Sequence, residues 1–259
     1  MVRFDSLISK LESGPLPKSE FNSCLNRVKN HFNCDLDSNQ LKEFGLPIVE
    51  DDENVCLQTY KNSYKDEIYC VVDIETNGNS PVKNQIIEIG AVKYQNGKVL
   101  DKFESYVYAD YIPSSIIRLT NIEVADLKGA PSLKDTLVKF KSFLADSVFV
   151  AHNVSFDYSF ISKSLETIGE ERLLNRRLCT VNLSRKTIEA DRHGLGFLRE
   201  HLDIDVGEHH RAYSDALSAA KVLDECFKNI PQNVITTEDL IKYSMGNSMK
   251  RVKSKKEIS

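Results

Sequence analysis

Two acids, Asp73 and Glu75, follow an apolar stretch and are the first candidates for chemistry in this chain. The pattern of residues 69–74 predicts a strand buried in a sheet, and Asn77 and Gly78 supply the turn that ends it. Residues two apart on a strand project from the same face. Two like charges held that close raise each other's pKa unless a cation lies between them, which favours a metal site. The other interpretation is that the acids only solubilise a strand end, so more carboxylates are needed to decide.

Asp157 is a candidate third carboxylate. It follows residues 147–151, a short apolar run that predicts a strand in the middle of a sheet. The helix expected after that strand places Asp157 in its first turn, at the carboxyl end of the strand, where α/β sheets bind ligands. A favourable interaction with the helix dipole is the alternative explanation for an acid at this position.

His210 and Asp215 lie five residues apart at the start of the last long apolar-patterned helix. Asp215 has apolar neighbours such as Ala216, which favours a partly buried carboxylate. His210 lies in the preceding loop, and a histidine with a pKa near neutrality can accept a proton from a reacting water. His209 beside it is an alternative base. Taken singly, a surface histidine and a solvated aspartate are the ordinary interpretations.

Together these stretches resemble the three motifs of the DEDDh family of 3′–5′ exonucleases. The residues that carry the resemblance are Asp73-x-Glu75, His152-Asn153-x-x-Phe156-Asp157 and His210-x-x-x-x-Asp215. The sister DEDDy group has a tyrosine four residues before the last Asp, where this chain has Arg211. The resemblance covers about residues 68–228, and within the family it is strongest to the epsilon proofreading subunits of bacterial DNA polymerase III.

The resemblance implies a ribonuclease H-like fold, a five-stranded mixed sheet flanked by helices. It also implies a metal-dependent exonuclease that releases nucleoside 5′-monophosphates from single-stranded or frayed DNA 3′ ends, as in replicative proofreading. Two divalent cations, Mg²⁺ or Mn²⁺, would lie about 3.5–4 Å apart. By resemblance, Asp73 bridges the two ions, Glu75 lies nearer the scissile end, and Asp157 and Asp215 complete the ligands. His210, which has the family spacing, is the expected general base.

The resemblance also implies substrate contacts. Thr76 and the backbone at Asn77 and Gly78 match positions that hold the terminal nucleotide, although the common family pattern has a second threonine where Asn77 stands. Phe156 could stack on a base or belong to the core. A ribonuclease that trims RNA 3′ ends is an alternative within the same chemistry. An inert binding or scaffold module of a replicase is the alternative from another class, and any metal-dependent nuclease activity would exclude it.

The pattern around the motifs predicts the elements that position them. A strand over 85–94, the hairpin turn Asn96-Gly97 and a strand over 99–109 extend the first strand into an antiparallel meander. Short helical turns over 113–127 and a helix over 131–145 follow. The remaining expected elements are a fifth strand over 178–183, a helix around 195–202 and the last helix up to 228.

Residues 1–62 have a different pattern from the rest of the chain. They predict three short helices and a hairpin over 48–60, an element order that resembles a winged-helix module. This segment has seven Lys or Arg against ten Asp or Glu, and four consecutive acids occupy the expected wing at 50–53. Such a surface suits phosphate poorly, so we expect this module to contact protein or to brace the main domain. Residues 62–67 are the expected polar linker.

The whole chain of 259 residues is 41% hydrophobic and has a formal net charge of -4 with a pI of about 5.9. A real core is therefore expected, and no overall basic field points to nucleic acid or an anionic membrane. The six cysteines show no zinc-binding spacing and are expected to be reduced thiols. The sequence also contains no stretch with the pattern of a signal peptide or membrane span, so a soluble cytoplasmic protein is expected.

Residues 229–259 are expected to form a basic flexible tail, with one helical turn over 237–241 and with lysine and arginine concentrated over 250–256. In epsilon subunits the segment after the nuclease domain contacts the polymerase III alpha subunit and the sliding clamp, so the resemblance implies these partners. Residues 232–235, Gln-Asn-Val-Ile, only faintly resemble a clamp-binding peptide because the expected aromatic residue is missing.

Overall fold

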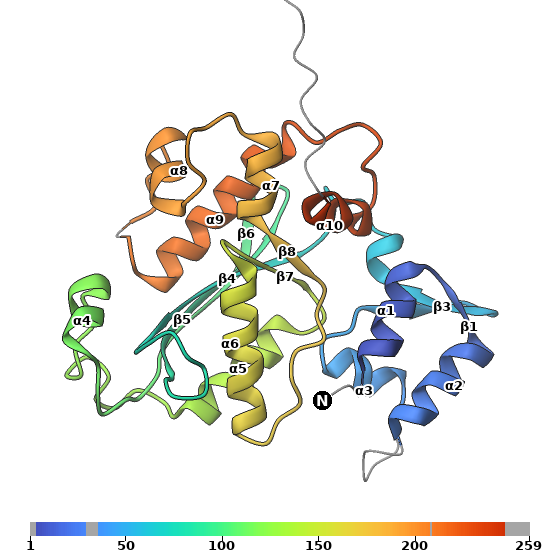
Figure 1. The fold of residues 1–259 in the computed structure, drawn as a ribbon, viewed down its shortest axis with the longest axis horizontal. Helices are drawn as coiled ribbons and strands as arrows, with labels where there is room; N and C mark the ends of the chain where they lie inside the picture. The colour runs from blue at the N-terminus through green and yellow to red at the C-terminus, as the bar shows by residue number, and fades with distance from the viewer. Residues whose placement is uncertain (1–3, 30–35, 208, 247–259) are drawn as a thin grey trace, which may run out of the picture.

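A computed structural model of the chain describes residues 4–29, 36–207 and 209–246. These residues form two sheets, one of three strands in the N-terminal segment and one of five strands in the order β6-β5-β4-β7-β8. Helices cover both faces of the larger sheet, and the N-terminal segment lies to one side of it (Figure 1).

The central sheet is mixed, as predicted. Its antiparallel part is the meander of β4 (Tyr69–Thr76), β5 (Ile86–Gln95) and β6 (Lys98–Tyr106), whereas β7 (Val148–Ala151) and β8 (Arg177–Cys179) continue it in parallel. Asn96 and Gly97 join β5 to β6 with φ values of 49° and 76°, the left-handed conformation that tight hairpin turns require. The expectation of a five-stranded mixed sheet flanked by helices is confirmed.

Successive side chains of β4 point alternately to the two faces of the sheet. Cys70, Val72 and Ile74 pack into the core beneath α5 (Leu133–Leu144) and α6 (Val154–Thr167). Tyr69 and Val71 pack into the opposite core, beneath α7 (Thr180–Thr187), α8 (Leu195–His201) and α9 (Ala212–Phe227). Asp73 and Glu75 continue the second series, so β4 points both carboxylates toward the face that α9 covers.

The predicted fifth strand over 178–183 is shorter than expected. It ends at Cys179, and Thr180 starts α7, whose buried residues Thr180, Leu183, Ser184 and Thr187 recur at helical spacing. A short apolar run does not distinguish a strand from a buried helix, which explains the error. The helical turns expected over 113–127 include α4 (Ser114–Thr120), which ends at Asn121 in the left-handed conformation.

The N-terminal segment contains the expected three helices and hairpin. They are α1 (Asp5–Ser13), α2 (Lys18–Lys29), α3 (Ser38–Glu43), β2 (Ile48–Glu50) and β3 (Asn54–Leu57), followed by the 3-10 turn η1 (Gln58–Tyr60). An additional strand, β1 (Leu16–Pro17), pairs with β3. Asp37 caps α3 through the backbone N–H groups of Asn39 and Gln40. These elements enclose their own cluster of buried apolar side chains, including Phe4, Leu11 and Phe21.

The C-terminal segment differs from the flexible tail expected from residue 229. Helix α10 (Thr237–Met245) packs Leu240 and Ile241 into the core on the α9 side of the sheet. Thr236 begins the helix with a capping box that involves Asp239. The helical turn expected over 237–241 is thus the start of a longer helix, which continues to Met245. The basic residues 250–256 lie outside the described part of the chain.

A buried ion cluster joins α10 to the N-terminal segment and the sheet. Arg176, just before β8, donates from Nε and Nη2 to the carboxylate of Glu238 on α10, at 3.1 and 2.6 Å. Its Nη1 contacts Glu12 of α1. Thr59 Oγ1 also donates to Glu238, at 2.8 Å. The N-terminal segment is therefore attached to the main domain through α10, which lies between them in Figure 1.

Residues 62–67 are more than the polar linker expected there. Tyr64 is buried in the core beside Phe227, and Ser63 forms a bridge with Thr236. Five of the six cysteines are described, and all five are buried free thiols. Among the described helices, none combines the length and apolarity needed to cross a membrane.

Candidate active site

Three carboxylates meet where β4 ends and α9 begins. One ligand oxygen from each of Asp73, Glu75 and Asp215 lies within 4.8 Å of the others. Asp73 and Glu75 share a face of β4, and the first turn of α9 brings Asp215 over that face. The structure therefore brings together three of the four acids predicted from the sequence.

Gly90 allows this approach of helix to sheet. It is paired with Asp73 across the β4–β5 ladder. A Cβ atom at Gly90 would lie 2.1 Å from the backbone nitrogen of Tyr213 and 2.2 Å from the carbonyl carbon of Ala212. The first turn of α9 thus rests directly on the backbone of β5, and only a residue without a side chain leaves room for it.

Asp157 stands beside the triplet but is not part of it. It lies in the first turn of α6, is 4% exposed, and accepts a hydrogen bond from the backbone N–H of Ile74, between Asp73 and Glu75. Burial raises the pKa of Asp157 to about 7. Its charge also helps to raise the pKa values of Asp73 and Glu75, which shows that the fourth acid acts on the same site.

The electrostatics of the cluster favour a bound cation. Burial, followed by the charges of Asp157, Asp215 and Glu75, raises the pKa of Asp73 well above its usual value. Burial and the neighbouring acids raise the pKa of Glu75 to about 8. A divalent cation would remove this repulsion, and carboxylate oxygens are the ligands that Mg²⁺ and Mn²⁺ prefer. The residues present therefore fit a divalent metal site.

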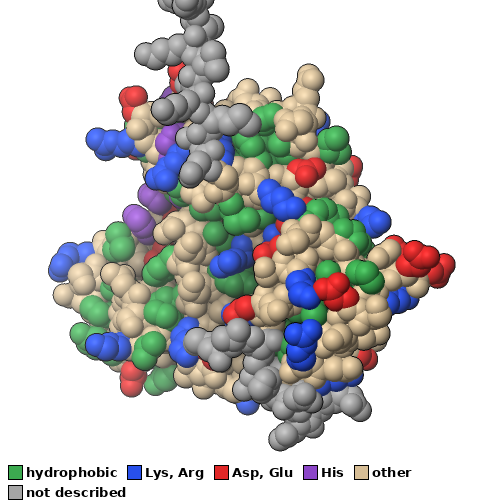
Figure 2. Space-filling view, turned by 45° about the vertical axis from the view of Figure 1, so that its right-hand side comes forward, with side chains coloured by type: hydrophobic (Ala, Val, Ile, Leu, Met, Phe, Trp, Pro, Cys, Tyr) green, Lys and Arg blue, Asp and Glu red, His purple; other side chains and the backbone are tan. Residues whose placement is uncertain are grey.

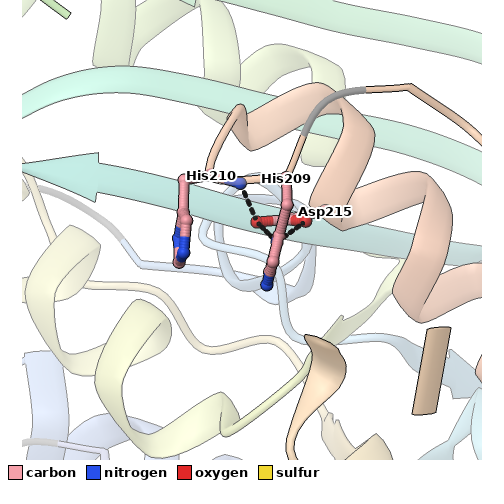
Figure 3. Close-up of side chains that lie close together, drawn as sticks. All are labelled: His209, His210 and Asp215. Carbon is pink, nitrogen blue, oxygen red and sulfur yellow. Dashed lines mark hydrogen bonds and ion pairs between the residues drawn. The ribbon is translucent and has the colours of Figure 1, made fainter. Parts of the chain in front are cut away.

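The loop before α9 carries two stacked histidines, drawn in Figure 3. The rings of His209 and His210 are nearly parallel, with centroids 4.1 Å apart. His209 Nδ1 lies 2.8 and 3.0 Å from the two carboxylate oxygens of Asp215. His210 instead donates its backbone N–H to Asp215, at 3.0 Å. His209, the alternative base considered above, thus binds the Asp215 carboxylate through its side chain.

His210 has the surroundings of a neutral base. Its φ of 61° lies in the left-handed region, which non-glycine residues seldom adopt, and the backbone bond to Asp215 fixes this turn. Burial, together with the adjacent His209, lowers the pKa of His210. The half-buried ring is therefore neutral near pH 7. The structure places no hydrogen-bond partner at its ring nitrogens among the described residues.

Sequence reasoning missed two residues that also contact the acids. Arg199 on α8 extends Nη1 to within 3.3 Å of Asp215 Oδ1. Glu88 on β5 is 1% exposed, is paired with Glu75 across the ladder, and binds Arg211. A single acid inside the apolar run Ile86-Ile87-Glu88-Ile89 was the available signal for Glu88. Nothing in the sequence pattern distinguished Arg199 from other helix-surface arginines.

The predicted nucleotide-binding residues after β4 are partly used within the protein. Thr76 donates its hydroxyl to the carbonyl of Gly78, at 2.9 Å. The Asn77 side chain accepts from the Gln85 N–H at 2.8 Å and donates to the Tyr111 carbonyl at 3.1 Å. The Asn77 N–H donates to the Gln85 carbonyl at 3.0 Å. The side-chain amide and the backbone N–H of Asn77 therefore form hydrogen bonds within the protein, and these bonds shape the turn.

Phe156 and His152 have structural contacts. Phe156 is half-buried against the core on the α6 side, with its ring 5.7 Å from that of Phe160. His152 accepts from Thr180 Oγ1 at Nδ1 and donates from Nε2 to the carbonyl of His193, each at 2.9 Å. Burial lowers the pKa of His152 to about 4, so this ring is neutral. The contacts of Phe156 fit the core alternative stated for it above.

The surface around the histidines shows no continuous basic field. In the space-filling view, histidine side chains gather on the left of the face, beside Lys and Arg side chains (Figure 2). Acidic side chains are interspersed with basic ones over the rest of that face. This agrees with the slightly negative net charge of the chain.

The fold and this collection of acids define a nuclease of the ribonuclease H-like class. The sequence profile of the RNase T exonuclease family matches residues 70–223, and the chain belongs to this exonuclease family. The match begins at β4 and ends within α9, so it includes all four acids and His210.

The chain is similar to PolC-type DNA polymerase III of two staphylococci. It is 34% identical over 209 residues to the protein of Staphylococcus aureus strain bovine RF122 / ET3-1, which covers 80% of this chain and 14% of the polymerase. It is 33% identical over 202 residues to that of Staphylococcus haemolyticus, covering 77% of this chain and 14% of the polymerase. The chain thus spans only about one seventh of these relatives. The aligned length of 209 residues exceeds that of the family match over residues 70–223.

Solved nuclease structures share the fold. Exonuclease X in complex with 5′ overhanging duplex DNA has a TM-score of 0.55 and 21% identity, covering 68% of this chain and 99% of that one. E. coli Exonuclease I in complex with an oligonucleotide has a TM-score of 0.57 and 15% identity, covering 69% of this chain and 43% of that one. At these identities the likeness concerns the fold alone.

Proposed function

We propose that this protein is a DEDDh 3′–5′ exonuclease that releases nucleoside 5′-monophosphates from DNA 3′ ends. The observation that carries the proposal is the triplet of carboxylate oxygens from Asp73, Glu75 and Asp215, within 4.8 Å of one another, with Asp157 beside it. The subclass rests on His210, five residues before Asp215, where a DEDDy enzyme has a tyrosine one position later.

Asp73, Glu75, Asp157 and Asp215 would hold two divalent cations, Mg²⁺ or Mn²⁺. When bound, such ions stabilise both the attacking and the leaving oxygen of a phosphodiester during in-line displacement. The four carboxylates supply the negative charge that retains the ions. Asp157 and Asp215 are each only 4% exposed, so the surrounding residues restrict the positions of these two carboxylates.

His210 would accept the proton of the attacking water. Its lowered pKa keeps the ring neutral at physiological pH, which a general base requires. The backbone bond of His210 to Asp215 couples the position of the base to that of a metal ligand. His209 would have a different role, in orienting the Asp215 carboxylate through Nδ1.

A proofreading role in a replicase is the biological context that we propose. The support is the similarity to PolC-type DNA polymerase III over 80% of this chain. The polymerase III alpha subunit and the sliding clamp are the proposed partners. A pull-down of the full chain with the replicative polymerase subunit tests this context, and recovery no greater than with a matrix control would contradict it.

The activity is tested with a 5′-labelled oligonucleotide supplied as DNA and as RNA of the same sequence. We expect a ladder of products shortened from the 3′ end, nucleoside 5′-monophosphates, and loss of activity in chelator or in Asp73→Ala. Faster digestion of RNA would replace the DNA assignment with 3′-end trimming of RNA. Cleavage that persists in chelator would refute the metal mechanism. A folded protein that cleaves neither the DNA nor the RNA oligonucleotide, with either metal, would favour the scaffold alternative.

A further inference from the structure

Glu88 is a fifth acid near the site, but its contacts differ from those of the other four. It lies on β5 with 1% of its surface exposed, directly opposite Glu75 in the ladder. Arg211 donates to Glu88 Oε1 from Nε and Nη2, at 3.2 and 3.0 Å. The backbone N–H of Ala212 donates to Oε2, at 3.1 Å. Both carboxylate oxygens are therefore engaged by the segment that begins α9.

These bonds anchor the start of α9 at two points. Ala212 is the first residue of the helix, so its N–H is one of the groups that has no partner within the helix. A buried carboxylate at this end satisfies that group and interacts favourably with the helix dipole. Arg211 also lies over the ring of Tyr106 on β6, with its guanidinium carbon 5.4 Å from the ring centroid.

The anchored segment connects two groups of the proposed mechanism. His210 immediately precedes Arg211, and Asp215 lies one helical turn after it. The Asp215 N–H donates to the Arg211 carbonyl at 2.9 Å, so the same residue that binds Glu88 also starts the turn that carries Asp215. A shift of Arg211 would therefore move the base and a metal ligand together.

We propose that Glu88 and Arg211 are positioning residues for the reaction, and this inference rests on the function proposed above. Glu88 fixes the first turn of α9 on β5, so that Asp215 and His210 keep their places relative to Asp73 and Glu75. Arg211 has a second effect. By occupying one Glu88 oxygen while Ala212 occupies the other, it keeps this carboxylate out of the metal-binding set.

The test compares two Arg–Glu pairs of the same protein, each with a buried glutamate. Glu88→Gln weakens the pair at the site, and Glu238→Gln weakens the pair with Arg176, which lies between α10 and the N-terminal segment. Both variants remove the charge of a buried carboxylate that binds an arginine. They differ in that only Glu88 contacts the segment carrying His210 and Asp215.

For Glu88→Gln we expect kcat on the oligonucleotide to fall on the order of 10–100-fold, the usual cost of losing an outer-shell partner of a metal ligand. The KM should change little, because a side chain with 1% of its surface exposed offers no contact to the substrate. Glu238→Gln should lower Tm while leaving kcat near that of the wild type. Arg211→Lys, which keeps the charge but not the fork of donors, should retain more activity than Arg211→Met.

A double variant, Glu88→Gln with Arg211→Met, distinguishes coupling from independent damage. We expect its loss of kcat to be smaller than the product of the two single losses, since both remove one interaction. Near-wild-type kcat in folded Glu88→Gln would overturn the inference, as would an equal loss of kcat in Glu238→Gln. An inactive wild-type enzyme would instead count against the proposed function.

Discussion

At the scale of single residues, the acids of the site differ in their partners. Asp215 receives hydrogen bonds from His209, His210 and Arg199. Asp73 and Glu75 instead feel mostly burial and like charge, so their pKa values rise. The repulsion that raises the pKa values of Asp73 and Glu75 is therefore left for a bound cation to relieve.

This difference predicts how stability depends on pH. The pKa rises from 4.5 to about 8 for Glu75 and from 3.8 to about 7 for Asp157. A group whose pKa is higher in the folded state contributes stability below its unfolded pKa and loses it as pH rises through the folded value. In chelator, Tm should therefore fall between about pH 4.5 and pH 8. Differential scanning fluorimetry measures this.

Saturating Mn²⁺ or Mg²⁺ should restore most of the loss at pH 8, because the ions bind the folded state. Glu75→Gln provides the control, since it removes one titrating group and should flatten the slope in chelator. A Tm in chelator that stays level or increases over this pH range would contradict the assigned electrostatics.

The two adjacent histidines should respond differently to substitution. His210→Ala should lower kcat on the order of 10²–10⁴-fold, the usual contribution of a general base. His209→Ala should chiefly raise the Mn²⁺ concentration needed for half-maximal activity, since it frees the Asp215 carboxylate. Activity measured against Mn²⁺ concentration separates the two effects. Equal metal requirement and equal kcat loss in both variants would assign them a shared role.

At the scale of elements, the contact between β5 and α9 controls the site. Gly90→Ala should lower both Tm and kcat, because its new Cβ cannot coexist with the backbone of Tyr213 at 2.1 Å. Circular dichroism melting and oligonucleotide digestion measure the two losses. Gly194→Ala is the matched control, since a Cβ there meets no atom within 4 Å. Full activity in Gly90→Ala would mean that α9 can move without disturbing Asp215.

The sequence predicted most of the central sheet because the signals there are local. Alternation in β4, the Asn96-Gly97 turn and the apolar run of β7 each identify an element without knowledge of its neighbours. The site acids and His210 were found through their spacing. Glu88 and Arg199 were not, because their importance depends on contacts with residues 123 and 16 positions away. Likewise, β8 and α10 owe their form to packing against the rest of the chain.

At the scale of the whole molecule, the N-terminal segment is attached to the main domain by an ion cluster and by apolar contacts. Its contacts run through Arg176, Glu238 and Thr59, and Leu174 of the main domain enters its buried cluster. This supports the bracing role expected from its acidic composition. Helix α10 belongs to this interface, because it carries Glu238 and buried apolar residues. A truncation meant to remove only a tail must therefore end after α10.

Two truncations test this organisation. A stop after residue 246 removes only the segment beyond α10 and should leave Tm and nuclease activity near those of the full chain. A stop after residue 229 removes α10, and with it Glu238 and the buried side chains of Leu240 and Ile241, so we expect the free energy of unfolding to fall by at least about 3–5 kcal/mol. Chemical denaturation measures the difference. Equal stability of both truncations would show that α10 does not support the fold.

The cluster around Glu238 also affects the order in which contacts can form while the chain is being synthesised. Thr59 and Glu238 are 179 residues apart, and synthesis at about 5–20 residues per second separates their appearance by roughly 10–40 s. Arg176 can meet Glu12 of the first module before Glu238 is made, but the bonds of Thr59 and of Arg176 Nε and Nη2 to Glu238 form only afterwards. All five proposed site residues leave the ribosome before α10. A nascent chain therefore contains all the proposed site residues before it can complete the contacts between α10 and its N-terminal segment.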